Sequence, residues 1–410
     1  QNTKYEYAFS DFPHSPTTSL HPSAEELCDY FQRYAVHKDL FDLIRFNTRV
    51  LSLERASPKE SQPAKGWWVR IAQGAVEGQQ EEKDLEPKDE VLYFDYVIVA
   101  TGQFVNTPDL PKVVQHEIED GGTFDGQVIH SQDYLDKKQL EGKNVAVVGF
   151  GKTALDIVVQ AAEHGASAHL IYRQPRWLLP VYLLGCLHYS YIMFARHATF
   201  FLFSWFNSPI QSFFQTFLWG LIPFLFWRLL EVVIRLSLLF GPYHPLVPKE
   251  DRLEDQLRSA IALSPPHFSA YVRQKKIHLH QGEIASFTKD SVVLNPTGPD
   301  ASSSSQKEGE EVGPLDMIIC ATGWKGHIPP FLPREVVKKH SREDGIHLYR
   351  HILHPDLPDL AFAGFNHGFM HLSAVELGMQ WLLSALEGDE VSIPSKAEQL
   401  RSIEEEATFK

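Results

Sequence analysis

The chain has few cysteines and no recognisable metal-binding pattern. Its 410 residues contain only Cys28, Cys186 and Cys320, and no two of them form a C-x-x-C pair. That spacing argues against a redox disulfide or a thiolate zinc site, and scattered thiols suit a reducing compartment. The twenty histidines include no H-E-x-x-H motif. We do not expect His278 and His280, which alternate on an expected strand, to bind a metal.

Basic residues are fewer than acidic residues. The chain has 38 Lys and Arg against 52 Asp and Glu, a formal net charge of −14. A nucleic-acid-binding protein normally carries a basic face, so no nucleic-acid partner is expected. Hydrophobic residues make up 43% of the chain, enough for a sizeable core, and its length predicts two domains. The sequence begins with Gln1, so the lack of a targeting signal carries no information.

The order of expected elements alternates between strands and helices. Ser23 followed by Glu26 is a capping box that predicts the start of a helix. Strands are expected over 44–56, 66–73, 93–104, 145–148, 315–320 and 357–365, and a helix from about Ser373 to Glu387. Residues 74–90 and 298–313 are polar and are expected to be loops, the second one mobile.

A glycine-rich turn follows the strand at 145–148. The residues are Gly149-Phe150-Gly151-Lys152-Thr153-Ala154, a G-x-G-x-x-A pattern. The first glycine permits a tight turn, the second lets a pyrophosphate approach the backbone, and the small third residue lets helix and strand pack closely. Phosphates would sit at the helix N-terminus, where free N–H groups and the helix dipole favour negative charge. The other interpretation is a tight turn without a ligand.

The end of the next strand indicates which nucleotide is bound. An NAD site usually carries Asp or Glu there for the ribose hydroxyls, whereas this strand ends in Arg173. A guanidinium can pair with a 2′-phosphate, which favours NADPH over NADH. The alternative is that Arg173 is a solvated charge without a ligand.

A second motif precedes the turn. Phe124, Gly126, His130 and Tyr134 resemble the F-x-G-x-x-x-H-x-x-x-[Y/F] fingerprint of flavin-containing monooxygenases. Tyr134 stands where the Baeyer–Villiger relatives usually carry Trp, which favours the N- and S-oxygenating branch. The resemblance is closest to plant-type members, and it extends to "FSDFP" at 9–13, to two "ATG" strand exits at 100–102 and 321–323, and to "HPDLPDLAFAGF" at 354–365.

The resemblance implies an α/β flavoprotein with two dinucleotide-binding domains. A Rossmann-like NADP domain (113–311) would be inserted in an FAD domain (1–112 and 312–410). Besides the turn residues and Arg173, the expected cofactor-binding residues are Phe124, Gly126, Thr101, Gly102, Thr322 and Gly323. His130 and Asn366 are the expected catalytic residues beside the cofactors, although a structural role explains each of them too.

The resemblance also implies a reaction. NADPH would reduce FAD, O2 would form a flavin C4a-hydroperoxide, and an amine nitrogen or sulfide sulfur would take the distal oxygen. The family carries an FAD glycine fingerprint before "FSDFP", and this sequence shows only one such unit. We therefore expect an incomplete sequence that holds FAD weakly. The alternatives are an NADPH-dependent flavin or quinone reductase and a truncated, non-catalytic NADP-binding protein.

Residues 181–240 form an apolar and aromatic segment. The run from Ala198 to Trp227 contains no charged residue but is interrupted by Pro and Gln, so two short amphipathic pieces fit it better than one span. Three interpretations stay open: attachment to one side of a membrane, a lid over the substrate channel, and a true span. The first predicts a membrane-associated protein facing the cytosol, for example on the endoplasmic reticulum. The alternative is a cytoplasmic location.

Overall fold

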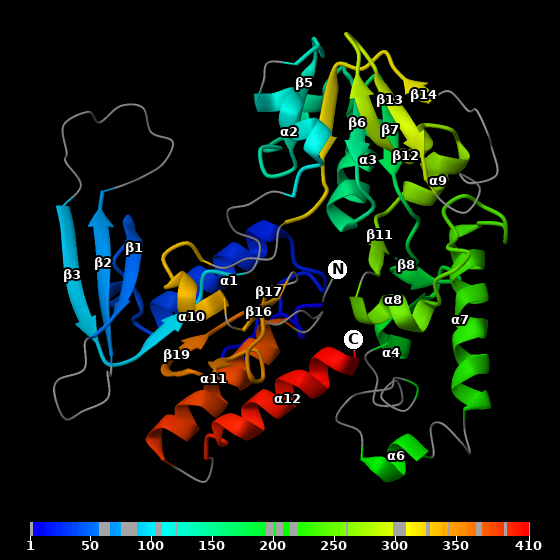
Figure 1. The fold of residues 1–410 in the computed structure, drawn as a ribbon. Helices are drawn as coiled ribbons and strands as arrows, with labels where there is room; N and C mark the ends of the chain where they lie inside the picture. The colour runs from blue at the N-terminus through cyan, green and yellow to red at the C-terminus, as the bar shows by residue number, and fades with distance from the viewer. Residues whose placement is uncertain are drawn as a thin grey trace. The chain divides into compact units, whose positions relative to one another are not determined.

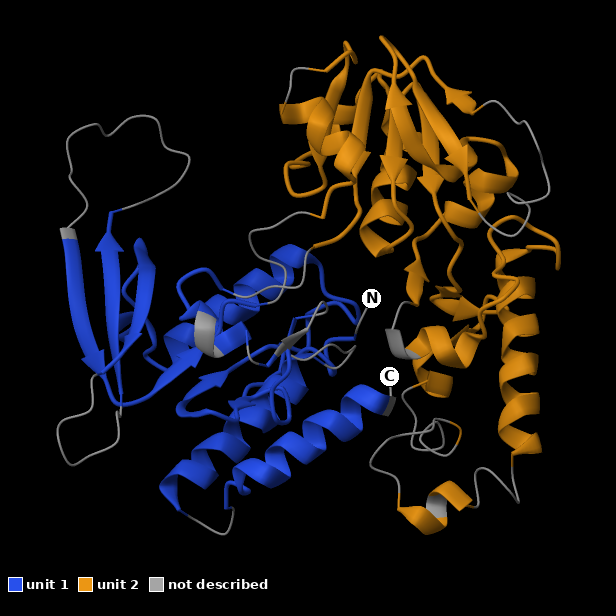
Figure 2. Ribbon diagram, viewed as in Figure 1, with its two compact units in different colours: residues 1–107, 325–410 blue, residues 108–324 orange. Residues whose placement is uncertain are grey.

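The computed structural model divides into two compact units, residues 1–107 with 325–410 (unit 1) and residues 108–324 (unit 2) (Figure 2). The structure describes residues 3–56, 66–74, 88–102, 109–119, 122–193, 201, 208–213, 220–259, 261–297, 309–324, 329–338, 340–342, 345–365, 371–388 and 392–409.

Unit 2 is built on a seven-stranded sheet with the order β14-β13-β12-β7-β6-β15-β5 (Figure 1). The strands are β5 (Gln127–His130), β6 (Asn144–Val148), β7 (Ser167–Tyr172), β12 (Ile277–Phe287), β13 (Val292–Pro296), β14 (Glu310–Val312) and β15 (Met317–Cys320). The five strands from β12 to β5 are parallel, and β13 and β14 extend the sheet antiparallel. This pattern is typical of a nucleotide-binding α/β domain.

Side chains alternate between the two faces of this sheet, as a strand period of two requires. Val145 and Val147 of β6 pack toward α3 (Lys152–His164). Ala146 and Val148 pack on the other face with Val114 of α2 (Lys112–Glu119). Because both faces are covered, β6 is apolar at nearly every position, as is usual for parallel strands.

The apolar segment of unit 2 contributes short elements and one long helix. They are β8 (Leu178–Pro180), β9 (Tyr182–Leu183), β10 (Leu187–His188), α4 (Ser190–Met193), α6 (Pro209–Phe213) and α7 (Leu221–Leu238); α8 (Leu253–Ser259), β11 (Ala262–Ser264) and α9 (Phe268–Arg273) follow. Instead of ending with the uncharged run at Trp227, α7 continues through Arg228, Glu231 and Arg235. Among the described residues, no helix combines the length and hydropathy that crossing a membrane requires.

Unit 1 combines a mixed sheet with an antiparallel meander. The mixed sheet has the order β18-β19-β4, from β4 (Val97–Val99), β18 (Leu353–His354) and β19 (Leu357–Phe362). The meander is β1 (Thr48–Arg55), β2 (Trp67–Gln73) and β3 (Lys88–Phe94). Further elements are α1 (Ala24–His37), α10 (Arg334–Lys338), β16 (Ser341–Arg342), β17 (Gly345–Ile346), α11 (His371–Glu387) and α12 (Lys396–Phe409), with two short 3-10 turns, Phe41–Leu43 in unit 1 and Lys137–Leu140 in unit 2.

Among its described residues, unit 1 has two hydrophobic cores. One joins Trp67 and Ile71 of β2 to Leu360 and Phe362 of β19, and the other packs Leu382 of α11 against Ala361. The expected capping box of α1 is confirmed: the Ser23 hydroxyl accepts from the Glu26 N–H at 3.1 Å, and the Glu26 carboxylate accepts from the Ser23 N–H at 2.9 Å.

Some elements differ from the sequence expectations. The strand expected over 93–104 is divided, because β3 ends at Phe94 and pairs in the meander while β4 starts at Val97 and pairs with β19. The loop expected over 298–313 ends earlier, since Glu310–Val312 pair with β13. The two units divide at 107/108 and 324/325, whereas the sequence predicts domain boundaries at 112/113 and 311/312. The later second boundary places β15 in unit 2, because β15 pairs with β6 and β5 of the unit 2 sheet.

Candidate functional site

The glycine-rich turn lies between β6 and α3, at the centre of the unit 2 sheet. Following β6, the chain passes through α3 to β7 on one side, while β15 lies against the other side of β6. Ligands of open α/β sheets bind at such a point, beyond the carboxyl ends of the strands. The structure thus places the turn where a dinucleotide would be bound.

The two glycines of the turn differ in their surroundings. Gly149 has a φ of +129°, and a Cβ there would lie 2.3 Å from the carbonyl oxygen of Ala321. Gly151 is the N-cap of α3 with a φ of −80°, and a Cβ there would meet no atom within 4 Å. The open space before Gly151, together with the free N–H groups of the first turn of α3, fits a pyrophosphate. The residues present therefore fit the phosphates of NADP.

The next residues line the first turn of α3. Lys152 and Thr153 are exposed, whereas Ala154 is fully buried and packs against the sheet. The ammonium of Lys152 forms an ion pair with Asp156, one turn further along the helix. The first turn contains no acidic residue, so the free N–H groups and the helix dipole favour an anion there.

Arg173 directly follows β7 and is three-quarters exposed. Its guanidinium lies 3.5 Å from the carboxylate of Glu283 on β12, and its backbone carbonyl accepts from Gln281 Nε2 and Thr297 Oγ1 at 3.3 and 2.7 Å. The backbone of Arg173 is thus held at the end of β7 while its side chain is accessible. An exposed ion pair of this kind is weak and leaves the guanidinium free to bind a stronger anion.

His130 is buried at the end of β5. Its Nδ1 accepts from the Gln132 N–H at 3.2 Å, and its ring meets Trp324 edge to face at 5.2 Å. Burial is the main cause that lowers the pKa of His130, and the backbone of Gly323 opposes this effect. The buried Nε2 finds no hydrogen-bond partner among the described residues. Burial therefore favours the neutral form of His130, and its Nε2 is placed for a further partner.

The other fingerprint residues connect strands and a helix of unit 2. The ring of Phe124 packs on Phe287, and a Cβ on Gly126 would lie 2.6 Å from the carbonyl oxygen of Asp316. Tyr134 donates to Gln160 of α3 at 2.6 Å. These contacts connect the segments on either side of β5 to β12, to the start of β15 and to α3. The three residues thus have a structural role in unit 2.

The two ATG exits are located in different units. Thr101 and Gly102 follow β4, and Gly102 has a φ of +75°. Thr322 and Gly323 follow β15, where the Thr322 hydroxyl donates to the carbonyl of Asp109 and the Gly323 carbonyl accepts from the Asp109 N–H at 3.0 Å. Asn366, the other expected catalytic residue, lies outside the described residues.

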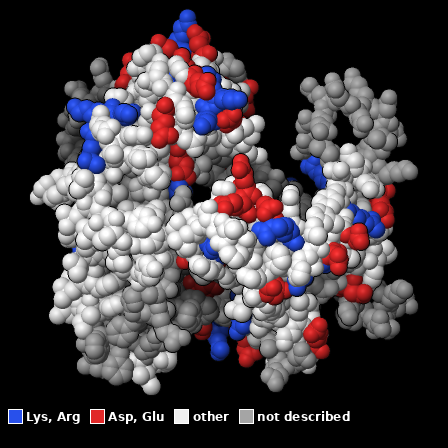
Figure 3. Space-filling model, turned by 180° about the vertical axis from the view of Figure 1, so that it is seen from behind, with Lys and Arg blue, Asp and Glu red and all other residues white. Residues whose placement is uncertain are grey.

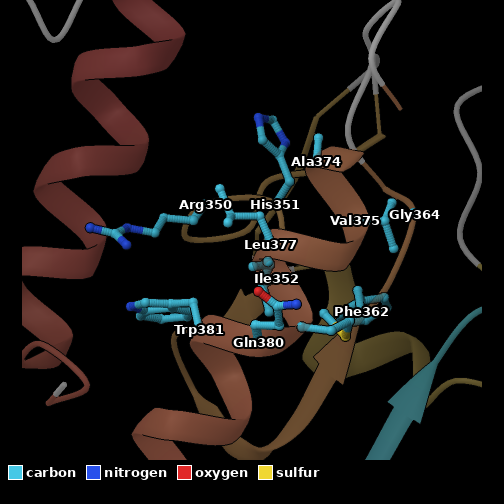
Figure 4. A pocket seen from close by; sticks show the side chains of 12 residues that line it. Arg350, His351, Ile352, Phe362, Gly364, Ala374, Val375, Leu377, Gln380 and Trp381 are labelled. Carbon is cyan, nitrogen blue, oxygen red and sulfur yellow. The ribbon is translucent and has the colours of Figure 1, made fainter. Parts of the chain in front are cut away.

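Sequence reasoning missed a cavity in unit 1. It has a volume of about 530 Å³ and lies between α11 and the residues around β18 and β19 (Figure 4). Ile352, Phe362, Val375 and Leu377 supply apolar walls, and Arg350 stacks over the ring of Trp381 at 4.9 Å. Its size suits a small organic molecule. Because its walls come from separate elements, no local sequence pattern marks it.

Unit 1 has some of the features that suit FAD. The exits of β4 and β19 both carry a glycine with positive φ, Gly102 and Gly364, and Gly364 borders the cavity. Among the described residues of unit 1, no glycine-rich turn connects a strand to a helix in the way that Gly149–Gly151 do. These residues can flank a flavin.

Comparison with known proteins places the chain in a family. A model of the family "Flavin-binding monooxygenase-like" matches residues 1–216. The probable flavin-containing monooxygenase 1 of Arabidopsis thaliana is 26% identical over 98% of this chain and 76% of that protein.

Solved structures share the fold. OTEMO in complex with FAD and NADP has a TM-score of 0.61 at 18% identity, over 100% of this chain and 81% of that one. The S-allyl-L-cysteine S-oxygenase of Allium sativum has a TM-score of 0.56 at 17% identity, and the match covers 98% of this chain but 64% of that one. The expected α/β fold with two dinucleotide-binding domains is confirmed.

The match of the family model to residues 1–216, more than half of the chain, leads to one assignment. The chain belongs to the flavin-binding monooxygenase-like family of oxidoreductases, which use FAD and NADPH.

Proposed function

We propose that the protein uses NADPH and O2 to oxygenate a soft nucleophile, a sulfide sulfur or an amine nitrogen. With a dialkyl sulfide as substrate, NADPH, a proton, O2 and the sulfide give NADP⁺, water and the corresponding sulfoxide. Bound FAD supplies the transfer of electrons from NADPH to oxygen. The residues of this chain bind and orient the cofactors and exclude water.

The observation that carries the proposal is the β6–α3–β7 unit, with an open Gly151 at the helix N-terminus and Arg173 at the end of β7. This arrangement suits the pyrophosphate and the 2′-phosphate of NADPH. His130 would provide its unpartnered Nε2 to a cofactor as a hydrogen-bonding group. The structural likeness to an S-oxygenase supports sulfur as one acceptor atom.

The cavity of unit 1 suits the proposed substrates. None of its lining residues is Asp or Glu, so it offers no counter-ion to an ammonium group. An apolar cavity favours a sulfide or the free-base form of an amine, and only these forms have the lone pair that takes the oxygen.

The experiment is an oxygen-transfer assay on the protein loaded with FAD. NADPH consumption is measured together with incorporation of ¹⁸O from ¹⁸O2 into thioanisole and N,N-dimethylaniline. Labelled sulfoxide or N-oxide in proportion to NADPH supports the proposal. NADPH consumption with hydrogen peroxide and no labelled product would indicate a reductase instead. Binding of NADPH without consumption would indicate a non-catalytic protein.

We also propose that the protein works at a membrane surface facing the cytosol. The apolar segment of unit 2, which carries α7, supports this location.

A further inference from the structure

The cavity of unit 1 is apolar but carries a cation on its wall. Among the described residues that line it, Arg350 is the only Lys or Arg, and none is Asp or Glu. His351, which also borders the cavity, is paired with Glu406 of α12 at 3.0 Å. The charge that these lining residues offer to a ligand therefore comes from Arg350.

Two aromatic rings hold the Arg350 side chain in place. Its Cζ lies 4.9 Å from the ring centroid of Trp381 and 5.5 Å from that of Tyr349. Contact with ring faces leaves the N–H donors of a guanidinium available, because they lie in its plane and point outward from its edge. Within the described part of the chain, the Arg350 guanidinium has neither a hydrogen bond nor an ion pair. Its position is thus fixed while its donors can serve a ligand.

The backbone at Arg350 is unfavourable for a long side chain. Arg350 and His351 have φ values of +53° and +59°. The Ile352 N–H donates to the Tyr349 carbonyl at 3.0 Å and closes the turn around them. Positive φ at both central residues is the pattern of a type I′ turn, which favours Asn and Gly. Strain of this kind is concentrated at ligand sites, so the turn has a long cationic side chain where stability alone favours a short one.

The overall charge of the protein does not attract anions. The chain has a formal net charge of −14, and on the face seen in Figure 3 the Lys and Arg side chains are scattered among Asp and Glu. An anionic ligand therefore needs a local cation with directed donors. A guanidinium meets this need for a carboxylate, which it can bind through two parallel N–H···O hydrogen bonds.

We propose that the substrate is a sulfide or amine that carries a carboxylate group, and that Arg350 binds this group. The inference deepens the proposed function and rests on it. Ile352 and Phe362 surround the hydrocarbon part of such a molecule. Figure 4 shows Arg350 and Gly364, at the exit of β19, on opposite sides of the cavity. Pairing at Arg350 thus directs the sulfur or nitrogen toward the strand exit, and the carboxylate keeps its charge throughout.

The test compares 3-(phenylthio)propanoate with its methyl ester, which has the same sulfide but no charge. Binding is measured by isothermal titration with excess FAD and without NADPH, so the result does not depend on turnover. We expect the acid to bind at least about tenfold more tightly than the ester, as a charge-assisted pair predicts. Arg350→Met should abolish this preference and Arg350→Lys should retain part of it. Arg45→Met is the matched control, because Arg45 is an exposed arginine of unit 1 that does not line the cavity.

A further variant separates ligand binding from a structural role. Asn suits a left-handed backbone better than Arg does, so Arg350→Asn should unfold at the same or a higher temperature than the unmodified protein. It should nevertheless lose the preference for the acid. A lower unfolding temperature together with a retained preference would show that Arg350 only stabilises unit 1.

Three results would overturn the inference. They are equal affinities for acid and ester in the unmodified protein, an equal loss of both ligands in Arg350→Met, and a loss of retained FAD in Arg350→Met. The last result would assign the anion at Arg350 to a cofactor phosphate. Addition of NADPH and ¹⁸O2 to the same samples separates the two proposals. Preferred binding of the acid without labelled sulfoxide would refute the oxygenation, whereas labelled sulfoxide from both compounds without a preference would refute the carboxylate site alone.

Discussion

Gly149 and Ala321 lie so close that only a hydrogen fits between the Gly149 Cα and the Ala321 carbonyl oxygen. A Cβ on Gly149 would lie 2.3 Å from that oxygen, and the φ of +129° is itself unfavourable for other residues. The contact joins the nucleotide turn after β6 to the ATG exit after β15. Ala321, which is distant in sequence, thus restrains the conformation of the turn at Gly149.

Gly149→Ala is therefore expected to destabilise unit 2. The positive φ and the close contact together predict a loss of at least about 2 kcal/mol in the free energy of unfolding. Denaturant unfolding followed by circular dichroism measures it. A variant as stable as the unmodified protein would show that the turn can relax away from Ala321.

Gly151→Ala is expected to affect the ligand and not the fold. Its φ of −80° is allowed for alanine and its Cβ would meet open space, so stability should change by less than about 1 kcal/mol. The methyl group would occupy the path of the pyrophosphate, so the Kd for NADP should rise at least about tenfold. Isothermal titration measures it, and an unchanged Kd would contradict placement of the phosphates at α3.

Arg173 is expected to select NADPH over NADH. Arg173→Ala should cost about 1–3 kcal/mol of NADPH binding and leave NADH binding unchanged, since only NADPH carries the 2′-phosphate. Glu283→Gln is the matched variant: it removes the anion that now pairs with Arg173, so NADPH affinity should rise up to about fivefold. If Arg173→Ala keeps the preference for NADPH over NADH, Arg173 does not bind the 2′-phosphate and is only a solvated charge.

The sequence predicts structural features correctly where the interacting residues lie only a few positions apart. The Ser23–Glu26 capping box and the turn from Gly149 to Ala154 need only neighbouring residues, and both occur where expected. The ends of β3 and β4 were not predictable, because the apolar run across Phe94 and Val97 does not show that its two halves pair in different sheets.

The rest of the candidate site depends on contacts between residues that lie far apart in sequence. The Tyr134 hydroxyl donates to Gln160, and Arg350 stacks on Trp381 beside the cavity. The sequence of α7 could not show which face is buried either, because the helix is apolar on both faces: Leu230 and Ile234 are buried, whereas Leu225 and Leu229 are exposed. Tertiary packing decides these features.

A buried carboxylate is expected to stabilise unit 1. Asp359 of β19 accepts from the Gly66 N–H at 2.9 Å and from Arg55 at 3.1 Å, and its side chain is 7% exposed. Asp359→Ala should cost about 3 kcal/mol or more of unfolding free energy, because it leaves a partly buried cation and a buried N–H without this acceptor. In contrast, Arg45→Ala breaks the exposed Arg45–Glu90 pair and should cost under about 1 kcal/mol. Equal losses in the two variants would contradict this assignment.

His169 of β7 is expected to make the protein sensitive to acid. Its Nδ1 lies 3.0 Å from His280 Nε2, its Nε2 lies 3.2 Å from Ser167 Oγ, and its ring stacks on that of His278. Burial, and next the nearby His280 and His278, lower the pKa of His169 to about 4. In the unfolded chain the pKa of a histidine is about 6.5, so between these values the unfolded state binds more protons than the folded state.

The free energy of unfolding should therefore be complete above about pH 6.5 and should fall as the pH falls toward about 4. His169→Gln, which retains hydrogen-bonding capacity, should flatten this dependence, as measured by denaturant unfolding at several pH values. His278→Gln is the matched control on the same sheet face: it removes one neighbouring charge but leaves the larger cause, burial, in place. If His278→Gln flattened the profile as much as His169→Gln, repulsion between histidines and not burial would keep His169 neutral.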